Sequence, residues 1–172
     1  MSDNIIVKSV VGTCISFSFI LAGNVITQCF TTIPALLIDF PSPGTKDHTS
    51  RARLLGRQWP LCWSVGNQFF RPISAFGIFG YAYTAYQTYR ANDRIGGDWK
   101  LLAVAAGMHV ATLVHSVVNM QPLNDRLEGL AKASEKELGE AEGIARKWAR
   151  WNLVRLVNPA VAGVCAIVFL VA

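Results

Sequence analysis

Charged residues are missing from four long stretches of this chain, and they are scarce overall. Only 16% of its 172 residues are Asp, Glu, Lys or Arg, whereas a typical soluble domain has about 25%. The sequence also lacks a Cys-x-x-Cys pair, an Asn-x-Ser/Thr acceptor, a Gly-rich phosphate loop and a Ser-His-Asp arrangement. These absences disfavour a thiol–disulfide reductase, a P-loop protein and a triad hydrolase.

Apolar sequence of membrane-spanning length is present instead. A bilayer core is crossed by about 20 apolar helical residues, and hydrophobic residues make up 52% of the chain. The four runs without a charge are Ser9–Ile38, Pro72–Tyr89, Leu101–Asn124 and Leu156–Ala172. They predict an all-α, up-down four-helix membrane bundle that forms a single domain over residues 1–172. The expected spans are roughly 5–38, 58–90, 98–121 and 147–171.

A further helix is expected between the third and fourth spans. Residues 125–147 are rich in Glu, Lys and Ala, and an apolar stripe follows helical spacing there. The stripe comprises Leu127, Ala131, Leu138, Ala141, Ala145 and Trp148. This pattern predicts a helix that lies over the cytosolic mouth of the bundle.

Basic residues predict the orientation of the chain. Four lie before the first run or in the loop 90–100, against eleven in the loops 39–57 and 125–155. Because Lys and Arg collect in cytoplasmic loops, loops one and three are expected in the cytosol and both termini on the other side. The same rule explains the net charge of +5 without a nucleic-acid partner. The endoplasmic reticulum or another endomembrane is the expected location.

Polar side chains inside the spans fall on one face of each helix. Such groups are costly at membrane depth and usually face the bundle interior or a cavity. The four faces are Asn24, Gln28 and Thr31; Trp59, Trp63, Asn67 and Arg71; Thr112, His115, Ser116 and Asn119; and Trp148, Asn152 and Arg155. Up-down topology would bring them to one membrane surface, which predicts a pocket. Each residue also has a plainer interpretation, as an interhelical hydrogen-bond partner or an interfacial anchor.

The histidines are poorly arranged for a metal. His109 and His115 are six residues apart, which places them about 120° apart around a helix. A histidine-only site that uses His48 stays open as an alternative. Haem is disfavoured because opposed axial histidines on different helices are not evident. No metal or organic cofactor is therefore expected.

Two sequence motifs carry a resemblance to a known family. Residues 120–127 read Met-Gln-Pro-Leu-Asn-Asp-Arg-Leu and fit a Met-x-Pro-x-Asn-x-x-Leu pattern that closes a third membrane helix. Residues 148–155 fit a Trp-x-x-x-(Asn/His)-x-x-Arg pattern that opens a fourth. With Pro34 and Gln58-Trp59 in the expected places, nearly the whole chain resembles the anthrone-oxygenase-like family, small four-helix membrane proteins of fungal polyketide pathways.

The resemblance implies that an anthrone is oxidised by O₂ to an anthraquinone without a cofactor. His115 is then the best candidate for the base, since imidazole titrates near neutral pH. Arg155, with Arg71, would stabilise the enolate oxygen. The predicted catalytic residues are His115, Arg155 and Asn152. The predicted substrate-binding residues are Gln28, Trp63, Asn67, Arg71, Asn119, Asn124, Trp148 and Trp151.

The implied partners are a flat aromatic polyketide, O₂ and membrane lipid, and a homo-oligomer is left open. Two non-enzymatic functions remain as alternatives. One is a membrane scaffold that docks a soluble pathway enzyme through the helix in 125–147, and the other is a carrier for a hydrophobic metabolite. Turnover of an anthrone by the purified protein would distinguish an enzyme from both.

Overall fold

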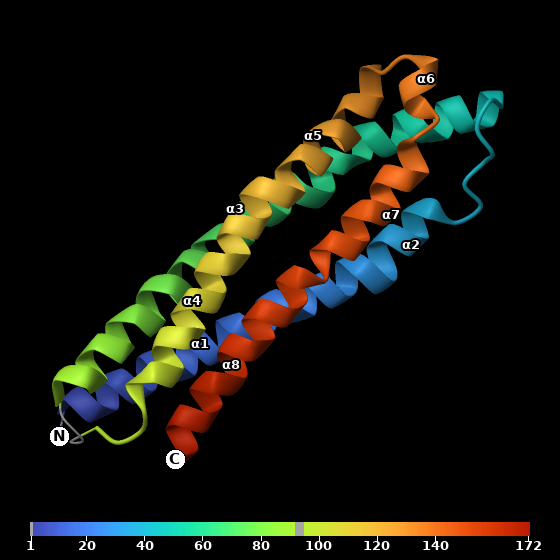
Figure 1. The fold of residues 1–172 in the computed structure, drawn as a ribbon. Helices are drawn as coiled ribbons and strands as arrows, with labels where there is room; N and C mark the ends of the chain where they lie inside the picture. Colours follow the sequence, from blue (N-terminus) through green and yellow to red (C-terminus); the bar gives the residue numbers. More distant parts are fainter. Residues whose placement is uncertain (1, 92–94) are drawn as a thin grey trace. The chain divides into compact units, whose positions relative to one another are not determined.

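The structure is a computed structural model that describes residues 2–91 and 95–172, and every regular element within these ranges is a helix. The all-α prediction is therefore confirmed. In chain order the elements are α1 (Ser2–Thr27), η1 (Gln28–Thr32), α2 (Ile33–Leu37), α3 (Lys46–Ala91), α4 (Trp99–His115), η2 (Ser116–Met120), α5 (Gln121–Gly129), η3 (Leu130–Lys132), α6 (Glu135–Leu138), α7 (Ala141–Asn152) and α8 (Val154–Val171) (Figure 1). Two of the short elements, η1 and η2, are π-helical, and η3 is a 3₁₀ turn.

Three helical stretches are long and apolar enough to cross a membrane: Asn4–Leu37, Trp99–Lys132 and Ala141–Val171. They correspond to the first, third and fourth predicted spans. The second predicted span lies in α3, which is not among them although it has 46 residues. Its uncharged part, residues 72–89, carries four tyrosines and a glutamine, and these make it less apolar than the other runs.

The second predicted helix begins earlier than the sequence analysis expected. The loop predicted over 39–57 is helical from Lys46 onward. Thr45 caps this helix, because its Oγ1 accepts a hydrogen bond from the backbone N–H of His48 at 3.1 Å. Asp47 adds a favourable negative charge in the first turn. Residues 92–94, in the loop expected after this helix, lie outside the described residues.

The helix predicted within 125–147 is interrupted. It ends as α5 at Gly129, and a new helix, α6, starts after Ser134 with a capping box. The Ser134 hydroxyl and backbone N–H both donate to the Glu137 carboxylate, and these hydrogen bonds lower the pKa of that carboxyl. Most of the apolar stripe is nevertheless buried, including Leu127 and Leu138.

The described chain divides into two compact units. Unit 1 contains Met1–Asn24, Phe70–Val114 and Val154–Ala172, and unit 2 contains Val25–Phe69 and His115–Leu153. Several helices contribute to both units, so this division does not test the prediction of a single domain over 1–172.

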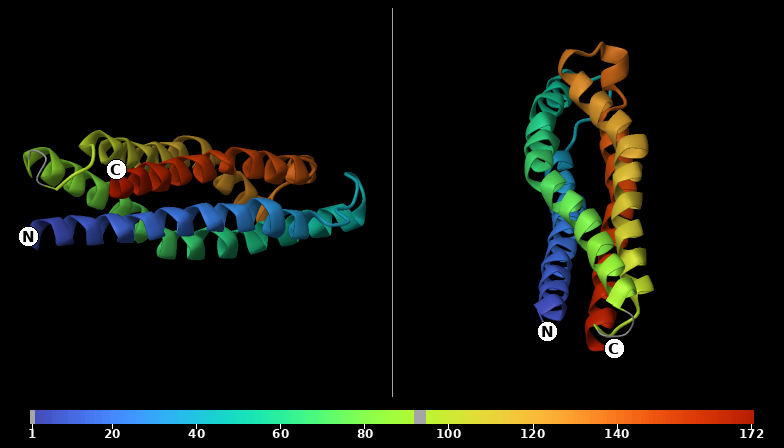
Figure 2. Two further views of the ribbon diagram at one scale, coloured as in Figure 1. Left: turned by 90° about the horizontal axis from the view of Figure 1, so that it is seen from below. Right: turned by 90° about the vertical axis from the view of Figure 1, so that its left-hand side faces the viewer.

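Unit 1 consists of α1, the second half of α3, most of α4, and α8. In this unit α1 and α4 begin at the end where α3 and α8 finish, so successive segments alternate in direction (Figures 1 and 2). Its core combines Val7, Val11, Cys14, Tyr81, Ala85, Ile95, Leu102, Ala105, Ala162, Ala166 and Phe169. Three buried polar side chains contact one another within this core. The Ser18 hydroxyl lies 3.1 Å from Tyr81 Oη and 3.0 Å from His109 Nε2.

Unit 2 consists of η1, α2, the first half of α3, and the elements from η2 to α7. Its core is larger and more aromatic, with Trp59, Met120, Leu127, Leu138 and Trp148 among its members. Gly56 allows α3 to pack closely against the backbone of Leu130 and Ala131, because a Cβ at this position would clash with that backbone. This packing holds the π-helical turns and the two buried tryptophans that build the candidate site.

Candidate active site

Two π-helical turns in unit 2 place the polar residues of the site. The N–H of Ile33 bonds to the carbonyl of Gln28, and the N–H of Gln121 bonds to the carbonyl of Ser116. A proline follows each of these donors, Pro34 and Pro122. Proline cannot donate to the ladder and crowds the preceding turn, which favours the wider i→i+5 spacing. Such π-turns are frequent at functional sites.

Asn124 joins the two buried tryptophans of the site. Its Oδ1 accepts hydrogen bonds from Trp148 Nε1 at 2.7 Å and Trp59 Nε1 at 3.2 Å. The indole rings meet edge to face, with centroids 5.2 Å apart and planes at 87°. One carboxamide oxygen therefore fixes two aromatic rings from different helices. The elements α3, α5 and α7 therefore bring these three polar side chains together.

His115 is held at both ring nitrogens. Its Nε2 lies 3.0 Å from the backbone carbonyl of Trp151, and its Nδ1 lies 3.1 Å from Nδ2 of Asn119. A carbonyl oxygen only accepts and a carboxamide nitrogen only donates. With Nδ2 of Asn119 as the donor, the two contacts match a neutral imidazole that carries hydrogen on Nε2. The ring is 8% exposed and tilts against the indole of Trp151, with centroids 5.7 Å apart.

Asn152 connects α7 to the π-turn η1. Its Nδ2 donates to Oε1 of Gln28 at 3.1 Å and lies 3.5 Å from Sγ of Cys29. Cys29 in turn donates to the carbonyl of Ala149 at 3.3 Å. Asn152 is fully buried, so these contacts satisfy an amide that would otherwise be costly at this depth. Asn152 and Gln28 are brought together, as the shared polar faces predict.

The remaining predicted residues occupy two environments. In unit 2, Trp63 and Asn67 are half-buried on α3, and the indole N–H of Trp63 is buried without a hydrogen-bond partner among the described residues. Trp151 on α7 is 40% exposed. In unit 1, Arg71 is exposed and Arg155 is half-buried. Arg155 follows Asn152 by three residues along the chain.

Two residues of this constellation were missed as site members by the sequence analysis. Trp59 was expected on the polar face of its helix but was not given a role, and it is the second donor to Asn124. Cys29 was not given a role, yet it contacts Asn152 and the carbonyl of Ala149, both on α7. The four-residue spacing from Trp59 to Trp63 was the available signal for the first, and no sequence signal marked the second.

The ionisable residues are dispersed. No group of three or more His, Cys, Asp or Glu residues is placed to hold a metal ion within 2–91 and 95–172. His48 packs edge to face on Phe40, with ring centroids 5.5 Å apart. His109 belongs to unit 1 and contacts Ser18. Each of the three histidines thus has its own separate surroundings.

Most of this constellation lies within a segment that matches a family model. Residues 59–165 match the model of the anthrone oxygenase family. The match covers more than half of the chain, so this protein belongs to the anthrone oxygenase family, as the motifs indicated. It is an oxygenase-type enzyme. The matched segment contains His115, Asn124, Trp148 and Asn152 but not Gln28.

Two curated fungal proteins are similar to this chain. One is a protein named monooxygenase hypC from Dothistroma septosporum, which is 29% identical over 143 residues, or 81% of this chain and 70% of that protein. Another is the anthrone oxygenase AgnL2 of Paecilomyces divaricatus, 26% identical over 145 residues and 81% of each chain. No solved structure matches the chain at a significant level.

Proposed function

We propose that this enzyme oxidises a polyketide anthrone to an anthraquinone with O₂, inside a membrane and without a metal or organic cofactor. The observation that carries the proposal is the position of His115, a largely buried imidazole whose Nδ1 lies 3.1 Å from Nδ2 of Asn119 and whose Nε2 lies 3.0 Å from a backbone carbonyl. A neutral imidazole in a largely buried, aromatic environment is a suitable base for a carbon acid.

The substrate carries the difficult chemistry. Removal of one methylene proton gives an enolate whose charge is spread over the carbonyl and both rings. The enolate passes one electron to O₂, and the carbon radical and superoxide then combine to form a C–O bond. The resulting peroxide takes up a proton. Loss of the second proton from the same carbon breaks the O–O bond, forms the quinone carbonyl and releases hydroxide, which becomes water.

His115 acts in this sequence as the proton carrier. The Asn119 carboxamide first turns away and frees the Nδ1 lone pair, which then takes the first proton. After rotation by about 180° about its terminal torsion, Oδ1 of Asn119 accepts a hydrogen bond from the new Nδ1–H. The same side chain therefore supports the ring in both protonation states. The proton then returns to the peroxide oxygen. A base positioned in this way contributes about 10²–10⁴-fold to a rate.

Polar groups and aromatic rings of unit 2 complete the proposed site. Asn152, Asn119 and Asn124 orient the hydroxyl groups of the substrate. The role of Arg155 and Arg71 as stabilisers of the enolate oxygen stays a prediction from the sequence, because both residues belong to unit 1. Charges aimed at a developing oxyanion contribute about 10²–10³-fold in catalysis. Trp63, Trp148 and Trp151 flank the fused rings, with Gln28 and Asn67 at the polar edge. The support for these roles is the shared location of most of these residues in unit 2 and the position of Arg155 close to Asn152 in sequence.

The membrane setting of the proposal rests on the outward apolar surface. Large hydrophobic side chains such as Phe30, Leu61, Phe79 and Val117 are 63–72% exposed. A lipid environment removes the free-energy cost of exposing such side chains to water. With three spans apolar enough to cross a membrane, α3 would be the fourth helix of an up-down bundle, and α6 and its neighbours would form the extra cytosolic helical region. Loops one and three face the cytosol of an endomembrane in this arrangement.

Turnover by the purified protein tests the proposal. Detergent-solubilised enzyme is mixed with a dihydroxyanthrone in air-saturated buffer, and quinone absorbance is followed against the spontaneous rate. The expected result is protein-dependent quinone formation that falls by about 10²-fold or more in His115→Ala. A scaffold or a carrier would leave quinone formation at the spontaneous rate. Quinone formation no faster than that rate would therefore overturn the enzymatic proposal.

A further inference from the structure

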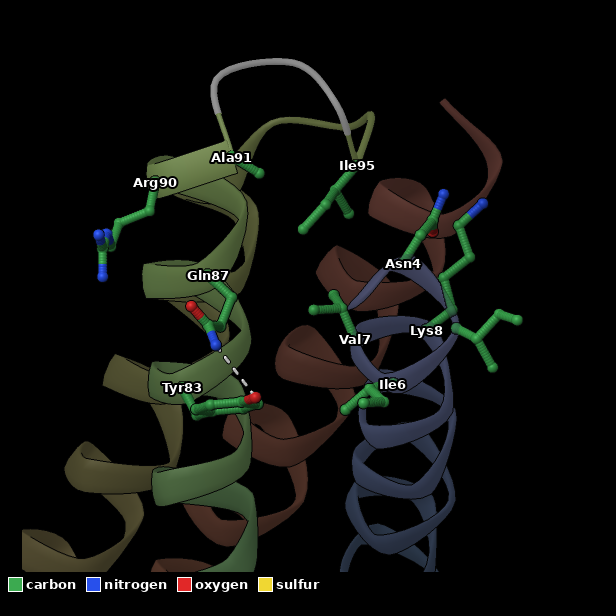
Figure 3. A pocket seen from close by; sticks show the side chains of 10 residues that line it. Asn4, Ile6, Val7, Lys8, Tyr83, Gln87, Arg90, Ala91 and Ile95 are labelled. Atoms are coloured by element: carbon green, nitrogen blue, oxygen red, sulfur yellow. Dashed lines mark hydrogen bonds between the residues drawn. The ribbon is translucent and has the colours of Figure 1, made fainter. Parts of the chain in front are cut away.

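Unit 1 contains a cavity that the proposed reaction does not use. It lies between the start of α1 and the end of α3 and has a volume of about 670 Å³, within the range of about 300–1,000 Å³ typical for small-molecule sites. Figure 3 shows Ile6 and Val7 on one wall, Tyr83 and Gln87 on the opposite wall, and Ile95 between them. Ile6 is 49% exposed and Tyr83 is 44% exposed, so the cavity is open to its surroundings.

The lining combines an apolar floor with unused hydrogen-bonding groups. Gln87 Nε2 donates to Tyr83 Oη at 3.1 Å, which leaves the Tyr83 hydrogen and the Gln87 Oε1 acceptor for a ligand. Asn4 also belongs to the lining of this space.

The charge of the lining has one sign. Lys8 and Arg90 belong to it, and none of the described lining residues is acidic. The Arg90 guanidinium is turned outward over the ring of Tyr86, 5.8 Å from its centroid (Figure 3), whereas the flexible Lys8 stem can bring its charge to the cavity. The site therefore favours a ligand with a flat apolar body, hydroxyl donors and an acidic oxygen.

We propose that this cavity is a second binding site for a hydroxylated, planar aromatic compound of the substrate or product class, with its phenolic edge toward Tyr83, Gln87 and Lys8. The choice of ligand rests on the proposed function. A phospholipid is the competing occupant, but an acyl chain would have to lie across Tyr83 and Gln87, which are polar. A flat polyphenol uses both the apolar wall and these groups.

Equilibrium dialysis of the full-length protein in detergent against a hydroxyanthraquinone counts the bound molecules. Two per chain are expected for the unsubstituted protein. Ile6→Trp, which fills the cavity, should leave one and weaken the other site by less than about twofold. Ile20→Trp is the matched control, because Ile20 lies on the same helix, is 45% exposed and does not line this cavity. It should leave both sites intact.

The polar side chains of the cavity lining are tested separately. Tyr83→Phe with Gln87→Leu should weaken the second site by about tenfold or more, and Tyr86→Phe, outside the cavity on the same helix, should not. The initial turnover rate at saturating anthrone should be unchanged in all of these variants. Retention of both bound molecules by Ile6→Trp would overturn the proposal, as would displacement of the second molecule by added phospholipid. If the unsubstituted protein binds two molecules but shows no turnover, the proposed reaction is rejected, whereas the second binding site is still supported.

Discussion

Asn119 donates its carboxamide N–H to Nδ1 of His115, one helical turn earlier, at 3.1 Å. The opposite ring nitrogen of His115 donates to the backbone carbonyl of Trp151. Together these contacts match a neutral imidazole with hydrogen on Nε2. Asn119 belongs to the π-turn η2, and His115 immediately precedes that turn, so the local backbone irregularity and the side-chain arrangement belong to one feature.

Asn119→Leu should therefore slow quinone formation by about tenfold or more, because the ring loses the partner that orients it in both protonation states. The protein should still fold, since Asn119 is only half-buried. Initial rates in detergent measure the effect, with circular dichroism as the folding check. Val117→Leu, at a 63% exposed position of the same turn, is the control and should keep its rate. Unchanged turnover in Asn119→Leu would remove Asn119 from the mechanism.

Arg155→Ala should lose about 10²-fold or more in turnover if the guanidinium stabilises the enolate, by analogy with the removal of an oxyanion donor. Arg155→Lys should recover only part of this loss, because a point charge replaces a planar fork. The comparison requires kcat and KM from the same preparations, with protein yield measured. If folded Arg155→Ala turns over normally, another group must stabilise the oxyanion.

Asn124→Leu should destabilise the protein more than it alters chemistry directly. It removes the shared acceptor of Trp59 and Trp148, whose side chains are 0% and 3% exposed. Each unpaired buried donor costs about 1–3 kcal/mol, so a clearly lower Tm is expected in detergent. Asp125→Asn, the exposed neighbour, is the control. A Tm equal to that of the unsubstituted protein would show that the tryptophan pair does not depend on Asn124.

The basic residues predict a specific protease-protection pattern in sealed microsomes. A tag inserted between Pro41 and Gly44, in the loop that precedes α3, should be cleaved by added protease, and tags at either terminus should be protected. Immunoblotting before and after detergent lysis gives the result. The opposite pattern would place loops one and three in the lumen and contradict the proposed orientation.

The sequence predicted the polar partners better than the boundaries of the helices. Period-four spacing placed Trp59, Trp148 and Asn152 on polar faces, and each of them contacts a polar side chain of another element, because membrane helices must bury such groups against each other. The start of α3 was missed because its capping residue, Thr45, lies among charged residues that resemble a loop. The apolar stripe through 127–148 was read as one helix, although Ser134 and Glu137 start a new one.

The π-turns and the long-range contacts could not be predicted from the spacing of residues along the sequence. The π-turns arise where a proline follows a helical run, and the sequence pattern does not distinguish this outcome from a simple kink. The contact between Asn152 and Cys29 joins residues 123 positions apart, and a cysteine in an apolar helix usually gives only packing. The lower apolarity of α3 was not foreseen, because the absence of charge was counted and the tyrosines were not; its membrane span stays a prediction.

Isotope labelling tests the central claim most directly. Purified, metal-analysed enzyme is mixed with a dihydroxyanthrone and labelled O₂ in the presence of a strong chelator, and the quinone is examined by mass spectrometry. The account predicts that chelation leaves the enzymatic rate unchanged, that metal is far below one equivalent, and that one labelled oxygen atom enters each quinone. Reversible loss of activity on chelation, or a new carbonyl oxygen that comes from water, would contradict it.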